Sequence, residues 1–427
     1  MASTNNRWHR VKLSSICDVV MGQSPPSSTY NEEGKGLPFF QGVKDFGRIY
    51  PSTKVYCTAN TRKIAEVGDV LLSVRAPVGE VNVASERCII GRGIAALRVK
   101  TRNENDQRFL YYLMLFNKRV WRQLHSGTTF EEITSEDIKD LEVFIPENIL
   151  ERHKIAEILG SLDDKIELNY EMNKTLEAIA QAIFKNWFVD FEPFKDELVY
   201  NEELKKKIPK GWEVRKISEL FDLIKGKKCN LLKKYEKGSL PYLLIETFEN
   251  GSINYWTDER QPFVEVEDIV IIADGERSGK VLRFKKGILG STLLMLKQKD
   301  TSYDFRNYAF LVLKSKENEL MQHRTGSAIP HLDKSYLADL QIIIPQPPSI
   351  LKEFNEIVDP IFRIVILNQD EVTTLSSIRD TLLPKLLSGE IRVKVDIEKE
   401  FPEEVNKLKK IEEEKVKLQE SLDKWLR

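Results

Sequence analysis

A long internal repeat constrains this chain of 427 residues more than any other feature of its sequence. The segment GTTFEEITSEDIKDLEVFIP is matched later by GSAIPHLDKSYLADLQIIIP, which places Gly127 on Gly326 and Pro146 on Pro345, a shift of 199 residues. The same shift aligns VGDVLLSV with VEDIVIIA upstream and IELNYEMNKTLEAI with VILNQDEVTTLSSI downstream. Because the shift stays constant over more than about 100 residues, the repeat indicates a duplicated domain and not a short solenoid period.

Within each copy, short strand-like runs are separated by turn residues. The first copy contains VGDVLLSV, GEVNVA and CIIGRGIAALRV, and the second contains EDIVIIA, KVLRF and GILGSTLLMLK. A helical segment follows in each copy, and then a last strand, LEVFIP or LQIIIP, that ends at a proline. We therefore predict an α+β fold with two similar mixed α/β domains, each with a curved sheet and a few helices.

A long helix is predicted after the last strand of each copy. Apolar residues recur there at alternating steps of four and three residues, which is the heptad pattern of a coiled coil. A helix of about 38 residues is roughly 55–60 Å long at ~1.5 Å per residue. The predicted pairing seam consists of Ile155, Leu159, Leu162, Ile166, Asn169 and Leu176 in the first copy and of Ile361, Val365, Asn368 and Leu375 in the second.

Both seams carry an asparagine at the same repeat position, Asn169 and Asn368. A polar seam residue costs stability but specifies the register and the partner of a helix. We therefore predict that the domains are joined by two long antiparallel coiled-coil helices, which pack on each other around a pseudo-twofold axis. The alternative is that each helix packs only on its own domain.

The repeat and the helices divide the chain into six parts. We expect the first domain at residues 1–148, its helix at 149–190, a connector at 191–210, the second domain at 211–348 and its helix at 349–391. The tail, residues 392–427, is expected to form an amphipathic helix that docks within the protein or binds a partner. Its predicted stripe consists of Leu408, Ile411, Lys415, Leu418, Leu422 and Trp425.

The composition excludes several classes of protein. No run approaches the ~18 uncharged apolar residues that a membrane helix needs, and MASTNNRWHRVK lacks the apolar core of a signal peptide, so we predict a cytoplasmic protein without a membrane partner. The four cysteines form no CxxC motif and the five histidines are scattered, which argues against a disulfide framework or a zinc site. The net charge of −1 leaves nucleic-acid binding open, because the average conceals a Lys-rich stretch at residues 205–237.

Motifs for catalysis and for cofactor binding are lacking in the sequence. GERSGKV has three residues before Gly-Lys where a P-loop has four, and GRG lacks the third glycine of a dinucleotide fingerprint. No NPPY-like or DPPY-like motif for methylation of base amino groups occurs. We therefore predict no catalytic residues, no cofactor and no metal, and a chain that is not itself an enzyme.

Four passages give the sequence a family resemblance. They are WHRVKLSSICDVVMGQSPPSSTYNEEGKGLPFFQG, VGDVLLSVRAPVGEVNVA, GTTFEEITSEDIKDLEVFIP and IAEILGSLDDKIELNYEMNKTLEAIAQAIFKNWFVDFEPF. In these passages the chain resembles the specificity subunit of type I restriction–modification systems, and the match leaves out only the tail after about Arg392. The second copy departs further from the family pattern than the first.

The resemblance implies a non-catalytic subunit with two target-recognition domains, each of which reads one part of a bipartite, asymmetric site in double-stranded DNA. It also implies that the long helices set the spacing between the domains and dock two modification (methyltransferase) subunits. Restriction subunits would join through the complex. Two similar domains with different surfaces would meet DNA as the halves of a dimeric repressor do.

Candidate DNA-binding residues lie in the loops of the two domains. Bases are read by paired donors and amides, whereas phosphates are held by Lys, Arg, small hydroxyl groups and backbone N–H groups. For each candidate, the alternative is an ordinary surface side chain. The predicted set is Gln23, Ser24, Lys44, Arg48, Arg75, Arg92, Thr128 and Thr129 in the first domain, and Lys225, Lys227, Lys228, Arg277, Ser278, Lys280, Ser327 and His331 in the second.

Two other functions are weighed against DNA recognition. A free-standing modification enzyme or nuclease would need a methyl-donor site or a metal-binding carboxylate motif, and neither is found in the sequence. A coiled-coil interaction protein would explain the helices but not two strand-rich domains with diverged basic loops. A gel shift at low and moderate salt separates DNA recognition from the coiled-coil alternative.

Overall fold

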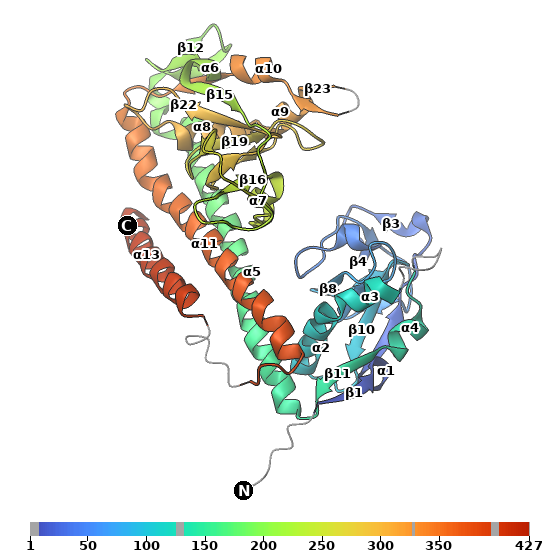
Figure 1. Ribbon diagram of the computed structural model, residues 1–427. Helices are drawn as coiled ribbons and strands as arrows, with labels where there is room; N and C mark the ends of the chain where they lie inside the picture. The colour runs from blue at the N-terminus through green and yellow to red at the C-terminus, as the bar shows by residue number, and fades with distance from the viewer. Residues whose placement is uncertain (1–7, 125–131, 327–328, 394–400, 427) are drawn as a thin grey trace. The chain divides into compact units, whose positions relative to one another are not determined.

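The computed structural model describes residues 8–124, 132–326, 329–393 and 401–426 (Figure 1). The chain divides into two compact units, each made of a domain and part of a helix pair. The first unit is Met1–Glu167 with Thr374–Asn406, and the second is Leu168–Thr373 with Lys407–Arg427. Among the described helices, none combines the length and the apolar character needed to cross a membrane.

The first unit contains two β-sheets that enclose a core. An antiparallel sheet has the order β2-β10-β7-β8, with β2 Cys17–Met21, β7 Val70–Ser73, β8 Val81–Val83 and β10 Ile94–Val99. A mixed sheet has the order β3-β5-β4-β9-β6, with β3 Tyr30–Asn31, β4 Leu37–Phe40, β5 Tyr56–Cys57, β6 Ile64–Ala65 and β9 Cys88–Ile90. Strand β7 is buried throughout, because its run VLLS supplies apolar side chains in sequence, and Leu71 packs with Phe40 and Ile90.

The remaining elements of the first domain link its sheets to the long helix. Strand β1 (Trp8–Lys12) pairs with β11 (Glu142–Pro146), the last strand before the helix. The side chain of Asn103 caps α2 by accepting hydrogen bonds from the backbone N–H groups of Asn105 and Asp106, at 2.9 and 3.2 Å. The helices of this domain are α1 Leu13–Ile16, α2 Glu104–Phe116, α3 Lys118–Leu124 and α4 Ser135–Asp140, with 3-10 turns at Ser27–Thr29 and Val43–Asp45.

The second unit repeats this plan, which confirms the predicted pair of mixed α/β domains. Its antiparallel sheet has the order β15-β22-β19-β20, with β15 Phe221–Lys225, β19 Ile269–Ile272, β20 Val281–Leu282 and β22 Leu293–Gln298. A second sheet, β17-β16-β21-β18, is formed by β16 Leu240–Leu243, β17 Trp256–Thr257, β18 Phe263–Val264 and β21 Gly287–Leu289. Pairs β14 Glu213–Lys216 with β25 Gln341–Ile344 and β23 Arg324–Thr325 with β24 His331–Leu332 complete the domain.

Four of the five helices described in the second domain follow the order of those of the first, and α7 stands after β16 where the first domain has the 3-10 turn Val43–Asp45. The five are α6 Ile217–Leu220, α7 Ile245–Asn250, α8 Arg306–Ser315, α9 Glu317–Gln322 and α10 Lys334–Asp339. The segment expected to be a connector is partly ordered, since it holds a 3-10 turn at Glu192–Glu197 and a hairpin of β12 Leu198–Asn201 and β13 Lys206–Pro209. Its Lys-rich sequence has no clear period and therefore does not predict the hairpin.

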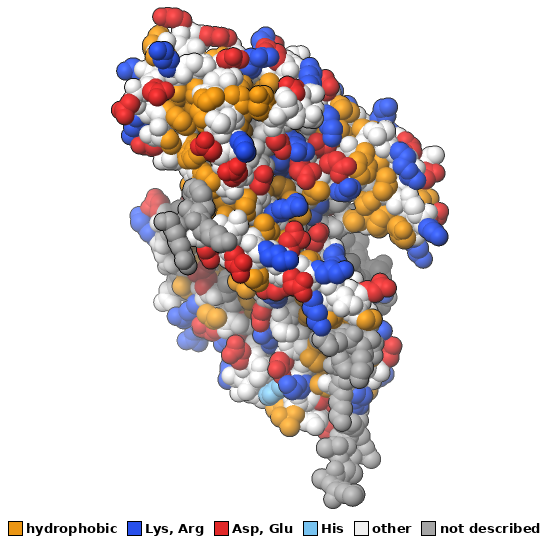
Figure 2. All heavy atoms as spheres, turned by 90° about the vertical axis from the view of Figure 1, so that its left-hand side faces the viewer, with side chains coloured by type: hydrophobic (Ala, Val, Ile, Leu, Met, Phe, Trp, Pro, Cys, Tyr) orange, Lys and Arg blue, Asp and Glu red, His pale blue; other side chains and the backbone are white. Residues whose placement is uncertain are grey.

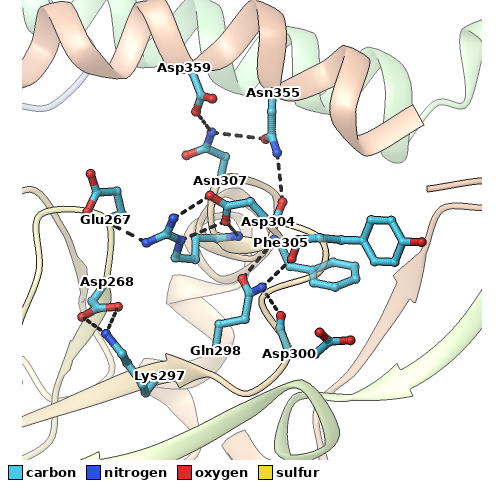
Figure 3. Close-up of polar contacts among 12 residues, drawn as sticks. Glu267, Asp268, Lys297, Gln298, Asp300, Asp304, Phe305, Asn307, Asn355 and Asp359 are labelled. Atoms are coloured by element: carbon cyan, nitrogen blue, oxygen red, sulfur yellow. Dashed lines mark hydrogen bonds and ion pairs between the residues drawn. The ribbon is translucent and has the colours of Figure 1, made fainter. Parts of the chain in front are cut away.

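An ion pair is retained at the same repeat position in both domains. Arg98 of β10 binds Asp69 in the first domain, with Nε at 2.7 Å from the carboxylate. At the positions 199 residues later, Lys297 binds Asp268 with Nζ at 3.0 Å (Figure 3). Both aspartates are nearly fully buried, so each needs a cation to offset the loss of water. The ion pair between the second-to-last residue of the long strand, β10 or β22, and the aspartate before the neighbouring strand, β7 or β19, is therefore part of the duplicated structure: Arg98 with Asp69, and Lys297 with Asp268.

The two long helices are α5 (Ile149–Phe188) and α11 (Ser349–Leu387), and they run antiparallel as predicted. In the second unit, Trp187 contacts Phe354 with ring centroids 6.1 Å apart, and Asn173 accepts a 2.7 Å hydrogen bond from Asn368. Advancing along α5 thus moves backwards along α11. In the first unit the same direction is set by Asp163 with Arg379 and by Glu151 with Arg392.

The predicted seam residues lie inside the helical core, where the two asparagines at equal repeat positions have different partners. Asn169 and Asn368 are each 0% exposed, but Asn368 donates to Asn173 and not to Asn169. In this antiparallel pair, Asn169 and Asn368 do not lie at the same height along the helix axis, although they are equivalent in the repeat. Asn368 instead faces Asn173, which lies one helical turn after Asn169 in α5. The other predicted seam residues are buried, with Leu176 partly so: Ile155, Leu159, Leu162, Ile166, Ile361, Val365 and Leu375.

The end of α5 packs on the second domain, although the first domain precedes it in the chain. The rings of Phe184 and Phe188 lie with centroids 5.9 and 4.9 Å from that of Tyr308, a buried residue of α8. Phe188 also contacts Trp212 at 5.9 Å. The alternative in which each helix packs only on its own domain is therefore wrong for α5.

The tail forms helix α13 (Pro402–Leu426), and its predicted apolar stripe contacts the second unit. Ile411 and Leu422 are buried, and Leu418 packs against the same core as Leu422. Lys415 interrupts the stripe, but its ammonium group binds the carboxylate of Glu371 on α11 and lies 3.5 Å from Asn169 Oδ1. The tail thus docks within the protein through a largely buried ion pair.

We expect Lys415→Met to lower the free energy of unfolding by roughly 2 kcal/mol, because the side chain of Glu371 is only 8% exposed and loses its cation. This cost is below that of a fully buried pair, since Lys415 is 12% exposed and Glu371 makes further polar interactions. A denaturant titration of the full chain measures it. Lys417→Met, at an exposed position of the same helix, is the control, and equal stability of the two variants would contradict the role of the pair.

Candidate nucleic-acid interface

Arg75 and Glu132 form an exposed ion pair at one end of the first domain. Arg75 follows β7, and its backbone forms an isolated antiparallel bridge with that of Glu132, which precedes α4. Arg75 Nη2 lies 3.1 and 3.0 Å from the two carboxylate oxygens of Glu132. The side chains are 43% and 46% exposed, so a donor and an acceptor stand side by side at the surface.

The second domain carries the same backbone bridge, with an aspartate in place of Arg75 and a histidine in place of Glu132. Positions 199 residues later are Asp274 and His331, and their backbones form the equivalent bridge. His331 Nδ1 lies 2.8 Å from Asp274 Oδ1, and Lys225 Nζ lies 2.5 Å from Asp274 Oδ2. Partial burial would raise the pKa of Asp274, but the hydrogen bonds from Lys225 and His331 outweigh it and lower the pKa.

Gln23, Ser24 and Arg92 are brought together in the first domain by two loops in close backbone contact. A Cβ on Gly22 would collide with the carbonyl oxygens of Gly91 and Ile94, so this approach requires a glycine. The Gln23 N–H donates to Ile90 O at 3.0 Å, and the Arg92 N–H lies 3.4 Å from Ser24 Oγ. The side chains of Gln23 and Arg92 remain exposed.

The corresponding loops of the second domain bring Lys227 and Lys228 to the surface. Gly226 repeats the close approach, because a Cβ there would collide with the carbonyl oxygen of Gly290. Tyr242 Oη donates to Lys227 O and accepts from the Ser291 N–H, each at 2.9 Å. Ser291 stands where the first domain has Arg92, so its repeat position and not its residue type alone indicates it as a candidate.

Several predicted residues are engaged elsewhere or buried. Arg48 binds Glu167 of α5 at 2.9 Å, which links the first domain to its helix. Arg277 and Lys280 both bind Glu249; burial would raise the pKa of that carboxyl group, but these hydrogen bonds lower it. Ser278 is 0% exposed, which is at odds with its predicted contact to DNA.

The remaining candidates divide between the exposed surface and the undescribed parts of the chain. Lys44 is exposed in the middle of the 3-10 turn Val43–Asp45. Thr128, Thr129 and Ser327 lie outside the described residues. On the face that Figure 2 presents, Lys and Arg side chains are interspersed with Asp and Glu and are not gathered into one basic patch.

Comparison with known proteins identifies the family. A model described as the type I restriction modification DNA specificity domain matches residues 5–178 and 209–375, which correspond to the two copies of the repeat. The specificity subunit of the type I restriction enzyme MjaIX from Methanocaldococcus jannaschii is 30% identical over 417 residues, covering 90% of this chain and 94% of the relative. That of HindI from Haemophilus influenzae is 26% identical over 368 residues, covering 66% of this chain and 77% of the relative.

A solved structure supports the fold. The crystal structure of the S subunit of a type I restriction–modification system from M. genitalium matches with a TM-score of 0.58 and 20% identity, over 90% of this chain and 97% of that chain. The resemblance stated from the sequence is confirmed, and so is the expectation of a recognition subunit without catalytic activity. The chain therefore belongs to the family of type I restriction–modification specificity subunits, the non-catalytic and DNA-binding members of a multisubunit assembly.

Proposed function

We propose that the two domains read different halves of a bipartite, asymmetric site in double-stranded DNA. The observation that carries this proposal is the reversed bridge, Arg75 with Glu132 in one domain and Asp274 with His331 in the other. The scaffold at this position is shared, but the order of donor and acceptor is not. Because arginine pairs with guanine and carboxylates accept from cytosine, reversed pairs favour different base pairs.

The exposed lysines and arginines of the neighbouring loops are assigned to phosphate contacts. Lys44 and Arg92 would contact phosphates in the first domain, and Lys227 and Lys228 would do so in the second. Phosphate contacts hold the register of a protein on DNA without reading its sequence, so these four residues supply affinity. Gln23 and Ser24 lie beside Arg92 and are assigned to base edges or sugars.

The long helices are assigned two further tasks. They set the distance between the half-sites, and they dock two modification subunits, while restriction subunits join through the complex. The apolar seam supports the first task, because packed helices are stiff over their length. The two recognition domains are proposed to span residues 1–148 and 211–348. The role places the protein in the cytoplasm, with the DNA that it reads.

The proposal is tested by mapping modified bases after co-expression with the cognate methyltransferase subunit. We expect a two-part, asymmetric motif with a constant gap. A gel shift of the assembled complex at low and moderate salt gives the affinity and its salt dependence. If the modified bases shared no two-part motif, the proposal would be wrong, whatever the affinity for DNA.

Arg75→Ala is expected to relax specificity at one position of the first half-site by ~1–3 kcal/mol, because a direct base contact is lost. Lys228→Ala is expected to weaken binding to all sequences and to reduce the salt slope by about 1, as loss of a phosphate contact does. Competition binding with substituted oligonucleotides at three salt concentrations measures both effects. Equal changes in specificity from the two variants would contradict the assignment.

A further inference from the structure

One face of α5 carries a stripe of side chains that the second unit leaves exposed. The stripe recurs at steps of four, three and four residues, which places its members on one side of the helix: Leu168, Met172, Thr175 and Ile179. The side chains of Leu168, Met172 and Ile179 are 54%, 38% and 44% exposed. Because an apolar stripe on a helix normally packs against another element, this face is open to a partner.

The equivalent stripe of α11 is buried along its whole length. Its members, 199 residues later, are 9%, 6%, 5% and 1% exposed: Leu367, Glu371, Thr374 and Ile378. Leucine, threonine and isoleucine stand at the same repeat positions in both stripes, and only methionine and glutamate differ. Residue type therefore does not explain the difference in exposure, and the cause lies in what covers each helix.

Helix α13 covers this side of α11 within the second unit, and Figure 1 shows it in red beside α11. The ammonium group of Lys415 binds the carboxylate of Glu371 and lies 3.5 Å from Asn169 Oδ1, so α13 contacts both long helices. Glu414 Oε1 lies 3.8 Å from Nε of Arg363, about two turns before Glu371 in α11. The tail of this chain thus occupies on α11 a surface whose equivalent on α5 is open.

The charges of α13 match the stripe of α11 but not that of α5. Met172 stands where Glu371 binds Lys415, so a second copy of α13 on α5 would place its ammonium group against an apolar side chain. An ammonium group that loses water without gaining a carboxylate is destabilising. The open stripe is therefore suited to an amphipathic helix that has an apolar residue where α13 has Lys415.

Helix α13 is held by few buried side chains. Among the side chains that the structure describes in α13, Ile411 and Leu422 are buried, and Leu408, Lys415 and Leu418 are partly so. Segments with few buried apolar contacts open at a lower free energy than the domains unfold. The tail can therefore leave α11 while both domains stay folded.

We propose that α13 competes with a modification subunit for the surface of α11, whereas the equivalent surface of α5 is open to another copy of that subunit. This inference rests on the proposed function, in which the long helices dock two modification subunits. The first subunit binds the open stripe directly. The second binds only where α13 has left, so its apparent affinity falls in proportion to the fraction of chains in that state.

The test releases α13 by changes confined to α13 in the full chain. The double variant Ile411→Asp, Leu422→Asp places carboxylates at its two buried positions, and Val416→Asp, Ser421→Asp adds the same charges at exposed ones. Hydrogen exchange of α13 reports its release, and calorimetry with the modification subunit reports both affinities. We expect the second subunit to bind the unaltered chain and the control at least ~10-fold more weakly than the first, and the released chain within about 3-fold of the first.

A second pair of variants tests the open stripe of α5. Ile179→Asp is expected to weaken the first subunit at least ~10-fold, because a carboxylate would be buried in the contact, whereas Gln181→Asp at an exposed position beside it should not. Circular dichroism verifies that each variant is folded.

Equal affinities of the unaltered chain for both subunits would overturn the competition, and so would release of α13 without tighter binding of the second subunit. Unchanged binding by Ile179→Asp would overturn the assignment of the stripe. Absence of any binding by the unaltered chain would instead count against the proposed function.

Discussion

Replacing Arg379 with methionine is expected to lower the free energy of unfolding by about 3–5 kcal/mol. Arg379 Nη1 lies 2.7 Å from Asp163 Oδ1, which joins α11 to α5 within the first unit. Asp163 is 3% exposed, and its other carboxylate oxygen accepts a 2.7 Å hydrogen bond from Tyr112. Removing the cation leaves a nearly buried carboxylate that one hydroxyl group cannot neutralise.

The measurement is a denaturant titration of the full chain, with two comparison variants. Lys174→Met removes an exposed cation of α5 that lies 3.8 Å from Glu171, and we expect it to change stability by less than ~1 kcal/mol. The double variant Asp163→Asn, Arg379→Met removes both charges and should recover part of the loss. A double variant as unstable as Arg379→Met alone would show that lost packing, and not the buried charge, is the cause.

Inserting one heptad into each long helix is expected to abolish modification of the original DNA site and to create a site with a longer gap. Seven residues add about 10 Å of helix, and B-DNA rises ~3.4 Å per base pair, so the gap should grow by about three base pairs. The insertions are placed after Ile166 in α5 and before Leu375 in α11, so that Asn169 and Glu371, which Lys415 of α13 contacts, stay on the same side of them. Both half-site sequences should stay the same, because the reading loops are untouched.

Mapping of modified bases after co-expression with the methyltransferase subunit reports the gap and the half-sites together. The control is the same heptad in α5 alone, which breaks the antiparallel pairing and should abolish modification without creating a new site. A changed half-site with an unchanged gap would show that the helices do not set the spacing.

The candidate DNA-binding loops show which contacts can be predicted from residue type alone and which cannot. Arg75 and His331 were both predicted as candidates, but their partners lie 57 residues away in the chain, so the sequence could not show that they occupy equivalent bridges. Arg48 has the same residue type and a similar loop setting, yet it binds Glu167, 119 residues away. Solvent-exposed cations have no periodic signature, and only folding decides whether an acid comes within reach.

The sequence by itself determined the duplication, the mixed domains and the antiparallel helices. Apolar side chains that become buried recur with the period of the helix or strand that holds them, so the sequence pattern predicts these elements. The tertiary structure alone decided that Asn368 faces Asn173 and that α5 completes the core of the second domain. These outcomes depend on contacts between residues far apart in sequence, where a shift of one helical turn or a larger side chain selects the partner.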